Sequence, residues 1–195
     1  GTATADWECN AASEAAEHAI DGTTTTKWCA NDALPHWLEV SLPEPTEVNY
    51  FVVKHAGTTT APPGDPGNND HPGMNTADFE IQVLDEYGEW QPLFTVVDNP
   101  GTEEGNVTEH ALTEPIVAQD FRLHITDPGE DNAARIYEFE IYKLSNPPVS
   151  VDPHRPVERL RSFELAQNYP NPFNGETLFE YFLPYRGEVT ARVFD

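Results

Sequence analysis

Apolar and polar residues alternate with a period of two in a series of short runs between residues 5 and 144. Successive side chains of a strand point to opposite faces of a sheet, so this alternation predicts strands that bury one face. The residues expected to face inward are Leu38, Val40 and Leu42; Phe51 and Val53; Phe79, Ile81 and Val83; Phe121, Leu123 and Ile125; and Phe139 and Ile141. Apart from one possible turn at 11–19, no amphipathic helix interrupts the series. The pattern predicts an all-β domain, a β-sandwich or jelly roll.

Two segments between the predicted strands, 57–76 and 127–134, contain several Gly, Pro, Asn and Asp residues. Twenty residues without regular structure are uncommon inside a compact domain, and such loops are usually functional or disordered. For the longer loop, the sequence leaves both alternatives open.

The composition changes after residue 144, which we take as the end of the domain 1–144. Residues 145–156 hold four prolines, so an extended linker is expected over 145–160. Alternating segments at 177–183 and 188–194 predict the first strands of a second β-domain, over 161–195. About 30 residues seldom bury enough surface to fold alone. This part is therefore expected to pack on a neighbour, to associate with another chain, or to be disordered.

The chain carries 34 acidic and 10 basic residues, a formal net charge of -24. Such a field repels nucleic acids and anionic membranes, and no apolar run is long enough to span a bilayer. Neither nucleic-acid binding nor membrane insertion is therefore expected. The acidity fits solubility outside the cell and favours bound cations. The first residues carry no signal peptide and resemble the interior of a longer protein, so they indicate no compartment.

The segment 17–28 combines an Asp-Gly turn, closely spaced threonines and a Trp, and is dense in oxygen donors. Calcium binds six to eight oxygens, which side chains and backbone carbonyls of one turn can supply together. Asp21 and Thr26 are the first candidate ligands. The alternative is an Asp-Gly turn without a metal.

The two cysteines, Cys9 and Cys29, lie on either side of this segment. A disulfide between them would close a loop of about 20 residues and stabilise the fold by roughly 3 kcal/mol. The alternative is a pair of free buried thiols. The features that point outside the cell, where disulfides persist, favour the disulfide.

Five stretches, in order, resemble the discoidin, or coagulation factor V/VIII type C, family in its bacterial carbohydrate-binding form: 19–28, 37–42, 79–83, 121–123 and 136–141. Three shorter segments, 53–57, 75–79 and 134–139, look closest to modules attached to secreted bacterial glycosidases, including α-mannosidases. The resemblance implies a galactose-binding-type jelly-roll β-sandwich. It also implies non-catalytic carbohydrate binding by a secreted or surface protein, in which the module targets an attached glycosidase to glycans.

The resemblance also implies a calcium (Ca²⁺) site. By position, Asp21 and Thr26 would give side-chain oxygens, Thr23 and Ala19 (or His18) would give backbone carbonyls, and Glu138 would close the site from the last strand. The alternative for Glu138 is an ordinary solvated side chain.

In the family that this sequence resembles, sugars bind at loops on one end of the sandwich. The contact residues expected by position are Asn31, Asp32, His55, Asn75, Asp78 and Arg135. His55 could instead cap a strand, and Arg135 could instead form an ion pair that holds the last strand. Ala77 stands where close relatives have an arginine, which removes a bidentate donor. Galactose-, mannose- and N-acetylglucosamine-type glycans are the expected partners.

The stretch 165–174 is similar to the C-terminal sorting domain of the type IX secretion system, an immunoglobulin-like domain. That similarity implies export of the parent protein by the type IX machinery. No G-x-S-x-G, H-E-x-x-H or paired Cys-His motif is present, so no catalytic activity is expected. The alternative function is a structural or adhesive module that contacts protein partners or self-associates.

Overall fold

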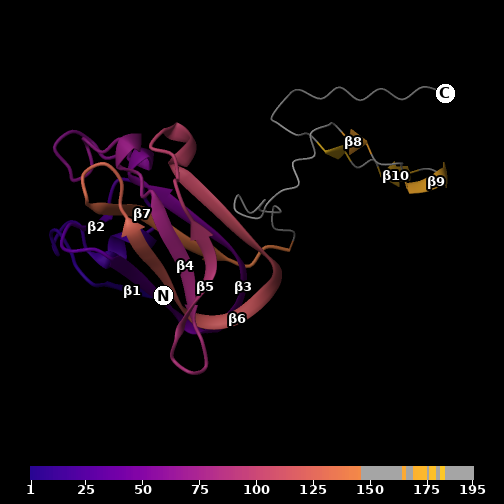
Figure 1. The fold of residues 1–195 in the computed structure, drawn as a ribbon, viewed down its shortest axis with the longest axis horizontal. Coiled ribbons are helices and arrows are strands. Elements are labelled where there is room, and N and C mark those ends of the chain that lie inside the picture. Colours follow the sequence, from indigo (N-terminus) through magenta and orange to yellow (C-terminus); the bar gives the residue numbers. More distant parts are fainter. Residues whose placement is uncertain (146–163, 166–168, 175, 179–180, 183–195) are drawn as a thin grey trace. The chain divides into compact units, whose positions relative to one another are not determined.

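Two long antiparallel strands, β3 (His36–His55) and β6 (Val107–Asp127), organise the fold in the computed structural model (Figure 1). The structure describes residues 1–145, 164–165, 169–174, 176–178 and 181–182. The chain divides into two units, Gly1–Ser150 and Val151–Asp195, and each is described by itself.

Both long strands are interrupted near their middle. Their pairing shifts in register after Ser41 and again after Val48. The first interruption contains Pro43 and Pro45 of β3, and the second contains Pro115 of β6. Proline has no N–H to donate to a ladder, and an unpaired residue bends a strand, so each long strand changes direction at its prolines.

Each long strand therefore belongs to both layers of the sandwich. The first half of β3 lies between β1 and the second half of β6, and its second half lies between β7 and the first half of β6. The other strands of this unit are β1 (Thr2–Ala5), β2 (Trp28–Ala30), β4 (Asp78–Leu84), β5 (Trp90–Val96) and β7 (Ala134–Tyr142). The hydrogen-bonded order is β2-β7-β3-β6-β4-β5, with β1 also on β3. The predicted all-β fold is confirmed.

The bends gather the loops of the domain at one end. Since β3 and β6 each run away from that end and return to it, the loops before and after both strands meet there. Backbone hydrogen bonds from His55 to Asn106 and from Ala77 to Asp127 join these loops directly. Short 3₁₀ turns complete the unit: η1 (Ala16–Ile20), η2 (Ala56–Thr58), η3 (Pro72–Met74) and η4 (Glu103–Gly105). None of the described helical segments has the length and apolarity needed to cross a bilayer.

The core consists of the side chains that the alternation placed inside. Most of the predicted inward residues are buried, while Leu42, Val83 and Ile141 are partly buried and pack against the same cluster. Trp28, which is fully buried, is the largest core side chain. The pattern did not reveal β1, β2, β5 or the first half of β6. In β5, for example, Pro92 and exposed polar residues obscure the alternation, because β5 is an edge strand.

The described residues of the second unit form four short strands: β8 (Glu164–Leu165), β9 (Tyr169–Asn174), β10 (Glu176–Leu178) and β11 (Tyr181–Phe182). They form two antiparallel pairs, β9 with β10 and β8 with β11. The predicted strand at 177–183 overlaps β10 and β11. The predicted strand at 188–194 and, apart from Ser145, the predicted linker lie outside the described residues. The immunoglobulin-like sorting domain stays a prediction.

Two histidines lie among the aromatic side chains of the core. The ring of His55 is 5.3 Å from that of Phe79, and His110 lies 5.2 Å from Phe94. Burial lowers the pKa of His55 to about 3, helped by His110, and burial lowers the pKa of His110 to about 4. Both rings are therefore neutral at physiological pH, and protonating them opposes folding.

We expect His110→Phe to make the domain less sensitive to acid. A histidine in the unfolded chain titrates near 6.5 and the folded His110 near 4, so between these values the unfolded chain binds more protons. Wild-type stability should therefore fall relative to the variant by about 2 kcal/mol between pH 7 and pH 5. Urea unfolding at both pH values measures this, and groups shared by the two proteins cancel in the comparison. A stability difference that does not change with pH would contradict the assignment.

Candidate functional site

The loop between η1 and β2 folds around the carboxylate of Asp21. The backbone N–H of Thr23 donates to Asp21 Oδ1 at 3.1 Å, and Thr26 Oγ1 donates to Asp21 Oδ2 at 2.6 Å. Gly22 has φ +83°, a left-handed conformation that glycine adopts without steric cost. The Asp-Gly sequence thus produces a tight turn with several oxygens directed toward one another.

Glu138 of β7 lies against this turn, although 116 residues separate it from Gly22 in the sequence. Glu138 is 2 % exposed, and its carboxylate lies against the backbone N–H groups of Gly22 and Thr23. The Oε1 atom has no hydrogen-bond partner among the described residues. Burial and the neighbouring charge of Asp21 raise the pKa of Glu138 to about 7. A buried carboxylate next to a second carboxylate is unfavourable unless a proton or a cation joins them.

The structure brings together four of the five predicted calcium ligands, Asp21, Thr23, Thr26 and Glu138, and places Ala19 in η1 just before them. The unpartnered oxygen of Glu138 and the hard oxygen donors around it suit a calcium ion. Another group of potential metal ligands in the described part of the chain is Cys9, Glu14 and Cys29. Its two sulfurs are joined to each other, so they are not available to a metal.

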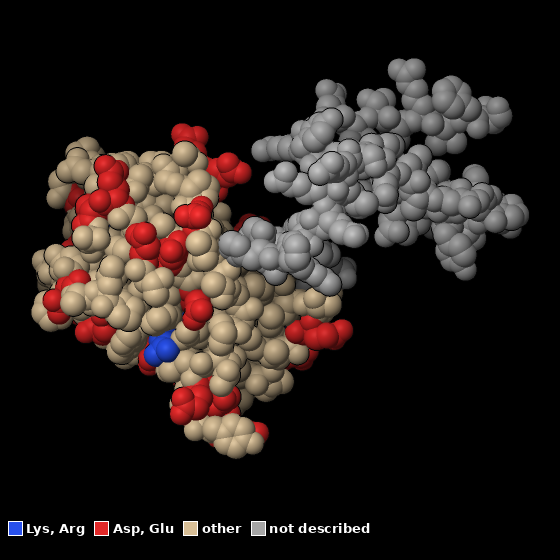
Figure 2. Space-filling view, viewed as in Figure 1, with Lys and Arg blue, Asp and Glu red and all other residues tan. Residues whose placement is uncertain are grey.

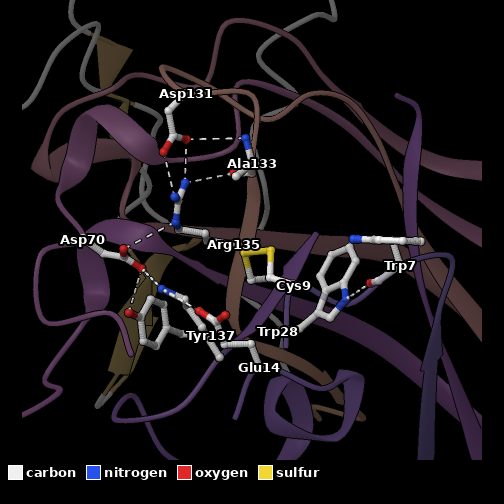
Figure 3. The surroundings of a disulfide bond; sticks show 11 residues. Trp7, Cys9, Glu14, Trp28, Asp70, Asp131, Ala133, Arg135 and Tyr137 are labelled. Atoms are coloured by element: carbon white, nitrogen blue, oxygen red, sulfur yellow. Dashed lines mark hydrogen bonds and ion pairs between the residues drawn. A yellow bond between two sulfur atoms is a disulfide. The ribbon is translucent and has the colours of Figure 1, made fainter. Parts of the chain in front are cut away.

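The predicted disulfide is confirmed. Cys9 and Cys29 are bonded with a Cα–Cα distance of 5.4 Å, and the backbone N–H of Cys9 also donates to the carbonyl of Cys29 at 2.8 Å. Next to it, the buried indole Nε1 of Trp28 donates to the carbonyl of Trp7 at 2.9 Å (Figure 3). The segment after β1 is therefore attached to β2 at several points.

A cluster of buried charges lies on the other side of the disulfide (Figure 3). Asp70, from the long loop 57–76, accepts from Lys27 Nζ at 2.6 Å and from the Tyr137 hydroxyl at 2.9 Å, and lies 3.4 Å from Arg135 Nε. Arg135 also makes a bidentate pair with Asp131 at 2.6 Å. The loop is thus held to β7 by Arg135 and Tyr137. It is also held to Lys27, directly before β2, by an ion pair with side chains that are only 4 % and 8 % exposed.

The six predicted sugar-contact residues lie in different environments in the structure. Asn31 and Asp32 are exposed in the loop between β2 and β3, and Asp78, at the start of β4, accepts from the backbone N–H of Asp98. Arg135 is occupied by Asp70 and Asp131, so of its two predicted roles the structure has the ion pair.

Two of the predicted contacts are buried. His55 is 0 % exposed among core rings, so its side chain does not reach a surface ligand. Asn75 is 1 % exposed, and its amide joins the loops by accepting from Gly57 and donating to Pro100, Thr102 and Asn106. Their positions relative to the family that the sequence resembles suggested a role in ligand contact for both residues, but loop packing, which the sequence pattern does not report, covers them.

Sequence reasoning assigned no role to Trp7, which is 47 % exposed. The chain segment that carries it is bonded to both strands that flank the exposed loop 31–35. Asp6 accepts from the backbone N–H of Trp37 at 2.8 Å, and Trp7 accepts from Trp28. Leu34, in that loop, is 41 % exposed. A Trp among polar residues, close to a cysteine, was the only available sign in the sequence.

The described surface is strongly acidic. Figure 2 shows acidic side chains spread over the face in view, with very few basic ones among them. Every Lys and Arg between residues 1 and 145 is engaged in an ion pair with a carboxylate: Lys27, Lys54, Arg122, Arg135 and Lys143. This part of the chain therefore offers an anionic ligand no unpaired cation.

Residues 2–139 match the model of the F5/8 type C domain. The chain belongs to this family. Among solved structures, it is similar to the family 32 carbohydrate-binding module of Streptococcus pneumoniae EndoD, with 30% identity, a TM-score of 0.57, and coverage of 73% of this chain and 96% of that one. A search of curated proteins gives no match.

Two further solved structures have the same fold. One is chitosan-binding module 1 of a chitosanase/glucanase from Paenibacillus sp. IK-5, with 26% identity, a TM-score of 0.55, and coverage of 72% and 93% of the two chains. The other is the family 32 module of C. perfringens NanJ in complex with galactose, with 23% identity, a TM-score of 0.57, and coverage of 73% and 93%. The predicted discoidin-like fold of this F5/8 type C domain is thereby confirmed, and these relatives are binding modules.

We expect Asp70→Asn to lower the free energy of unfolding by about 3 kcal/mol, because it leaves Lys27 and Arg135 buried with less compensation. Urea unfolding at neutral pH measures the loss. The matched control is Glu47→Gln, which breaks an ion pair of the same 2.6 Å length whose side chains are about half exposed. That exposed pair should contribute less than about 1 kcal/mol. Equal losses in the two variants would contradict the structural role of the Asp70 cluster.

Proposed function

We propose that this F5/8 type C domain is a non-catalytic module that binds glycans and is stabilised by calcium. The observation that carries the proposal is its 30% identity, over 96% of the solved chain, to a carbohydrate-binding module. The exposed loops at one end of a rigid sandwich suit ligand recognition, because the scaffold fixes the position of each loop. Domains of this kind occur in extracellular or surface proteins, and the disulfide suits the same environment.

The negative charge of the domain limits the class of glycan that we propose as its ligand. The ligands named for the similar modules are cationic, neutral and acidic glycans, namely chitosan, galactose and pectin, so the fold alone does not choose among them. Since each described basic residue is paired with a carboxylate, a sugar acid would meet repulsion without a compensating cation. We therefore propose neutral or amino sugars as ligands. This range contains the galactose-, mannose- and N-acetylglucosamine-type glycans expected from the sequence.

The proposed calcium ligands are Ala19, Asp21, Thr23, Thr26 and Glu138. Bound calcium would supply positive charge between the carboxylates of Asp21 and Glu138. These residues belong to the η1–β2 loop and to β7, so they would hold that loop to the sheet. The buried Glu138 oxygen without a partner supports this assignment.

In the whole protein, we propose that the module holds an attached glycosidase, or another surface protein, at its glycan. The resemblance of 165–174 to a type IX sorting domain supports the proposal of export by that machinery. A single shallow sugar site binds weakly, so neighbouring modules would raise the affinity through avidity.

Adding calcium to the EDTA-treated domain should raise the midpoint of thermal unfolding by several degrees. A ligand present at 100 times its Kd and bound only by the folded state contributes about 2.7 kcal/mol. Asp21→Asn and Glu138→Gln should abolish the shift, whereas Asp65→Asn, an exposed carboxylate of the long loop, should retain it. Without calcium, Glu138→Gln should be at least as stable as wild type, because the amide removes a buried charge. The absence of any shift in wild type would refute the calcium site.

Binding should depend on the charge of the glycan. Affinity electrophoresis in gels containing galactan, chitosan or polygalacturonate should show retardation of the domain by a neutral or cationic polymer and none by polygalacturonate at low salt. Retardation by chitosan should weaken as salt increases, because screening reduces the attraction of the acidic surface. Preferential retardation by polygalacturonate would contradict the proposed ligand class.

A further inference from the structure

Trp7 is exposed and lies on the opposite side of the disulfide from the buried charge cluster (Figure 3). Its segment is hydrogen-bonded to Trp28 and Trp37, which belong to the two strands that flank the loop 31–35. We propose that Trp7 is the surface on which a hexopyranose of the glycan stacks, with Asn31 and Asp32 binding its hydroxyl groups. This proposal rests on the proposed glycan-binding function. We call Trp7, Asn31, Asp32 and Leu34 the Trp7 surface.

The backbone of Trp7 is held in place from three directions. Its carbonyl accepts from the buried Trp28 indole, and two residues later Cys9 is bonded to Cys29 through both the disulfide and a backbone hydrogen bond. On the preceding side, Asp6 Oδ1 accepts from the backbone of Trp37 and Asp6 Oδ2 lies 2.8 Å from His36 Nδ1. An aromatic side chain on so constrained a segment loses little conformational freedom when a ligand binds.

The same contacts attach the Trp7 segment to both strands that flank Asn31 and Asp32. Trp28 and Cys29 belong to β2, which ends at Ala30 directly before the loop 31–35, and His36 and Trp37 follow the loop directly. The Trp7 segment therefore lies against both ends of that loop, all five residues of which are exposed. Asn31 supplies an amide donor and acceptor and Asp32 a carboxylate, the groups that bind paired sugar hydroxyls.

Exposure also favours Trp7 over the other aromatic residues. Sugar rings have an apolar face that an indole can cover, and Trp7 and Leu34 expose 47% and 41% of their surface beside polar groups. By contrast, the guanidinium of Arg122 lies over the Trp90 ring at 4.4 Å, and Tyr142 packs near Tyr50. Within the described residues, no aromatic ring or cation is found over Trp7.

Tyr87 provides a matched control. It is 82% exposed at the tip of the β4–β5 hairpin, and that tip lies at the far end of β4 from the joined loops. The tip residues around it are three carboxylates and Gly88. Like Trp7 it is an exposed aromatic side chain, but it lies away from the loop that holds Asn31 and Asp32.

Isothermal titration of the full chain with lactose and with chitotriose tests the proposal. Trp7→Ala should weaken the binding of whichever probe wild type binds by at least tenfold, Trp7→Phe by less than about fivefold, and Tyr87→Ala not at all. Asn31→Ala, which leaves the indole in place, should also weaken binding at least fivefold. Near-ultraviolet circular dichroism and the unfolding midpoint establish that each variant is folded.

Three outcomes would overturn the proposal. If wild type binds a probe and folded Trp7→Ala binds it equally well, Trp7 is not the stacking surface, while the glycan-binding function stands. If Tyr87→Ala weakens binding as much as Trp7→Ala, the ligand does not depend on the Trp7 surface specifically. If wild type binds neither these probes nor the polymers of the electrophoresis experiment, both the Trp7 surface and the proposed function are refuted.

Discussion

The pairing of β3 with β6 is the interaction on which the rest of the domain depends. These two strands supply hydrogen bonds to both layers, and the bends at Pro43, Pro45 and Pro115 return each strand to the end from which it started. All loops that begin or end on β3 and β6 consequently meet at that end. Asn75, in the loop after β3, then joins that loop to the loop before β6 through one buried amide. The position of the loop surface thus follows from where proline interrupts two ladders.

Charge is the second constraint, because the domain must fold with a large excess of carboxylates. The charge of a buried carboxylate is compensated in different ways at two places in the domain. Asp70 is compensated by Lys27 and Arg135 within the protein. Glu138 next to Asp21 has backbone donors but no basic partner, which is why a calcium ion suits that position. The remaining carboxylates are more exposed to solvent, where ionisation costs little free energy. At the surface they repel acidic ligands.

Much of the fold could be predicted from the sequence, because alternation reports directly which side chains face inward. The alternation did not predict strands in which polar residues face the core, as His110 does in β6. It also did not predict the edge strand β5, which has no continuous buried face. The turn around Asp21 could also be predicted from the sequence, because its hydrogen bonds join residues that are close together in the chain. His55 and Asn75 were assigned to the surface from their positions at strand ends, but loops distant in sequence cover both. The attachment of the Trp7 segment to Trp28 and Trp37 is likewise a long-range contact with no local pattern.

The Cys9–Cys29 disulfide determines when the Trp7 segment becomes rigid as well as where it lies. Hydrogen bonds to Trp28 and Trp37 can form as soon as the sandwich folds, whereas the covalent link requires an oxidant. In a reducing compartment, the chain after β1 would therefore be tethered by hydrogen bonds alone and would fray more readily, since short peripheral segments open at low free-energy cost. The Trp7 segment would reach its final rigidity only in an oxidising environment. One bond thus makes the rigidity of this segment depend on the redox conditions around the protein.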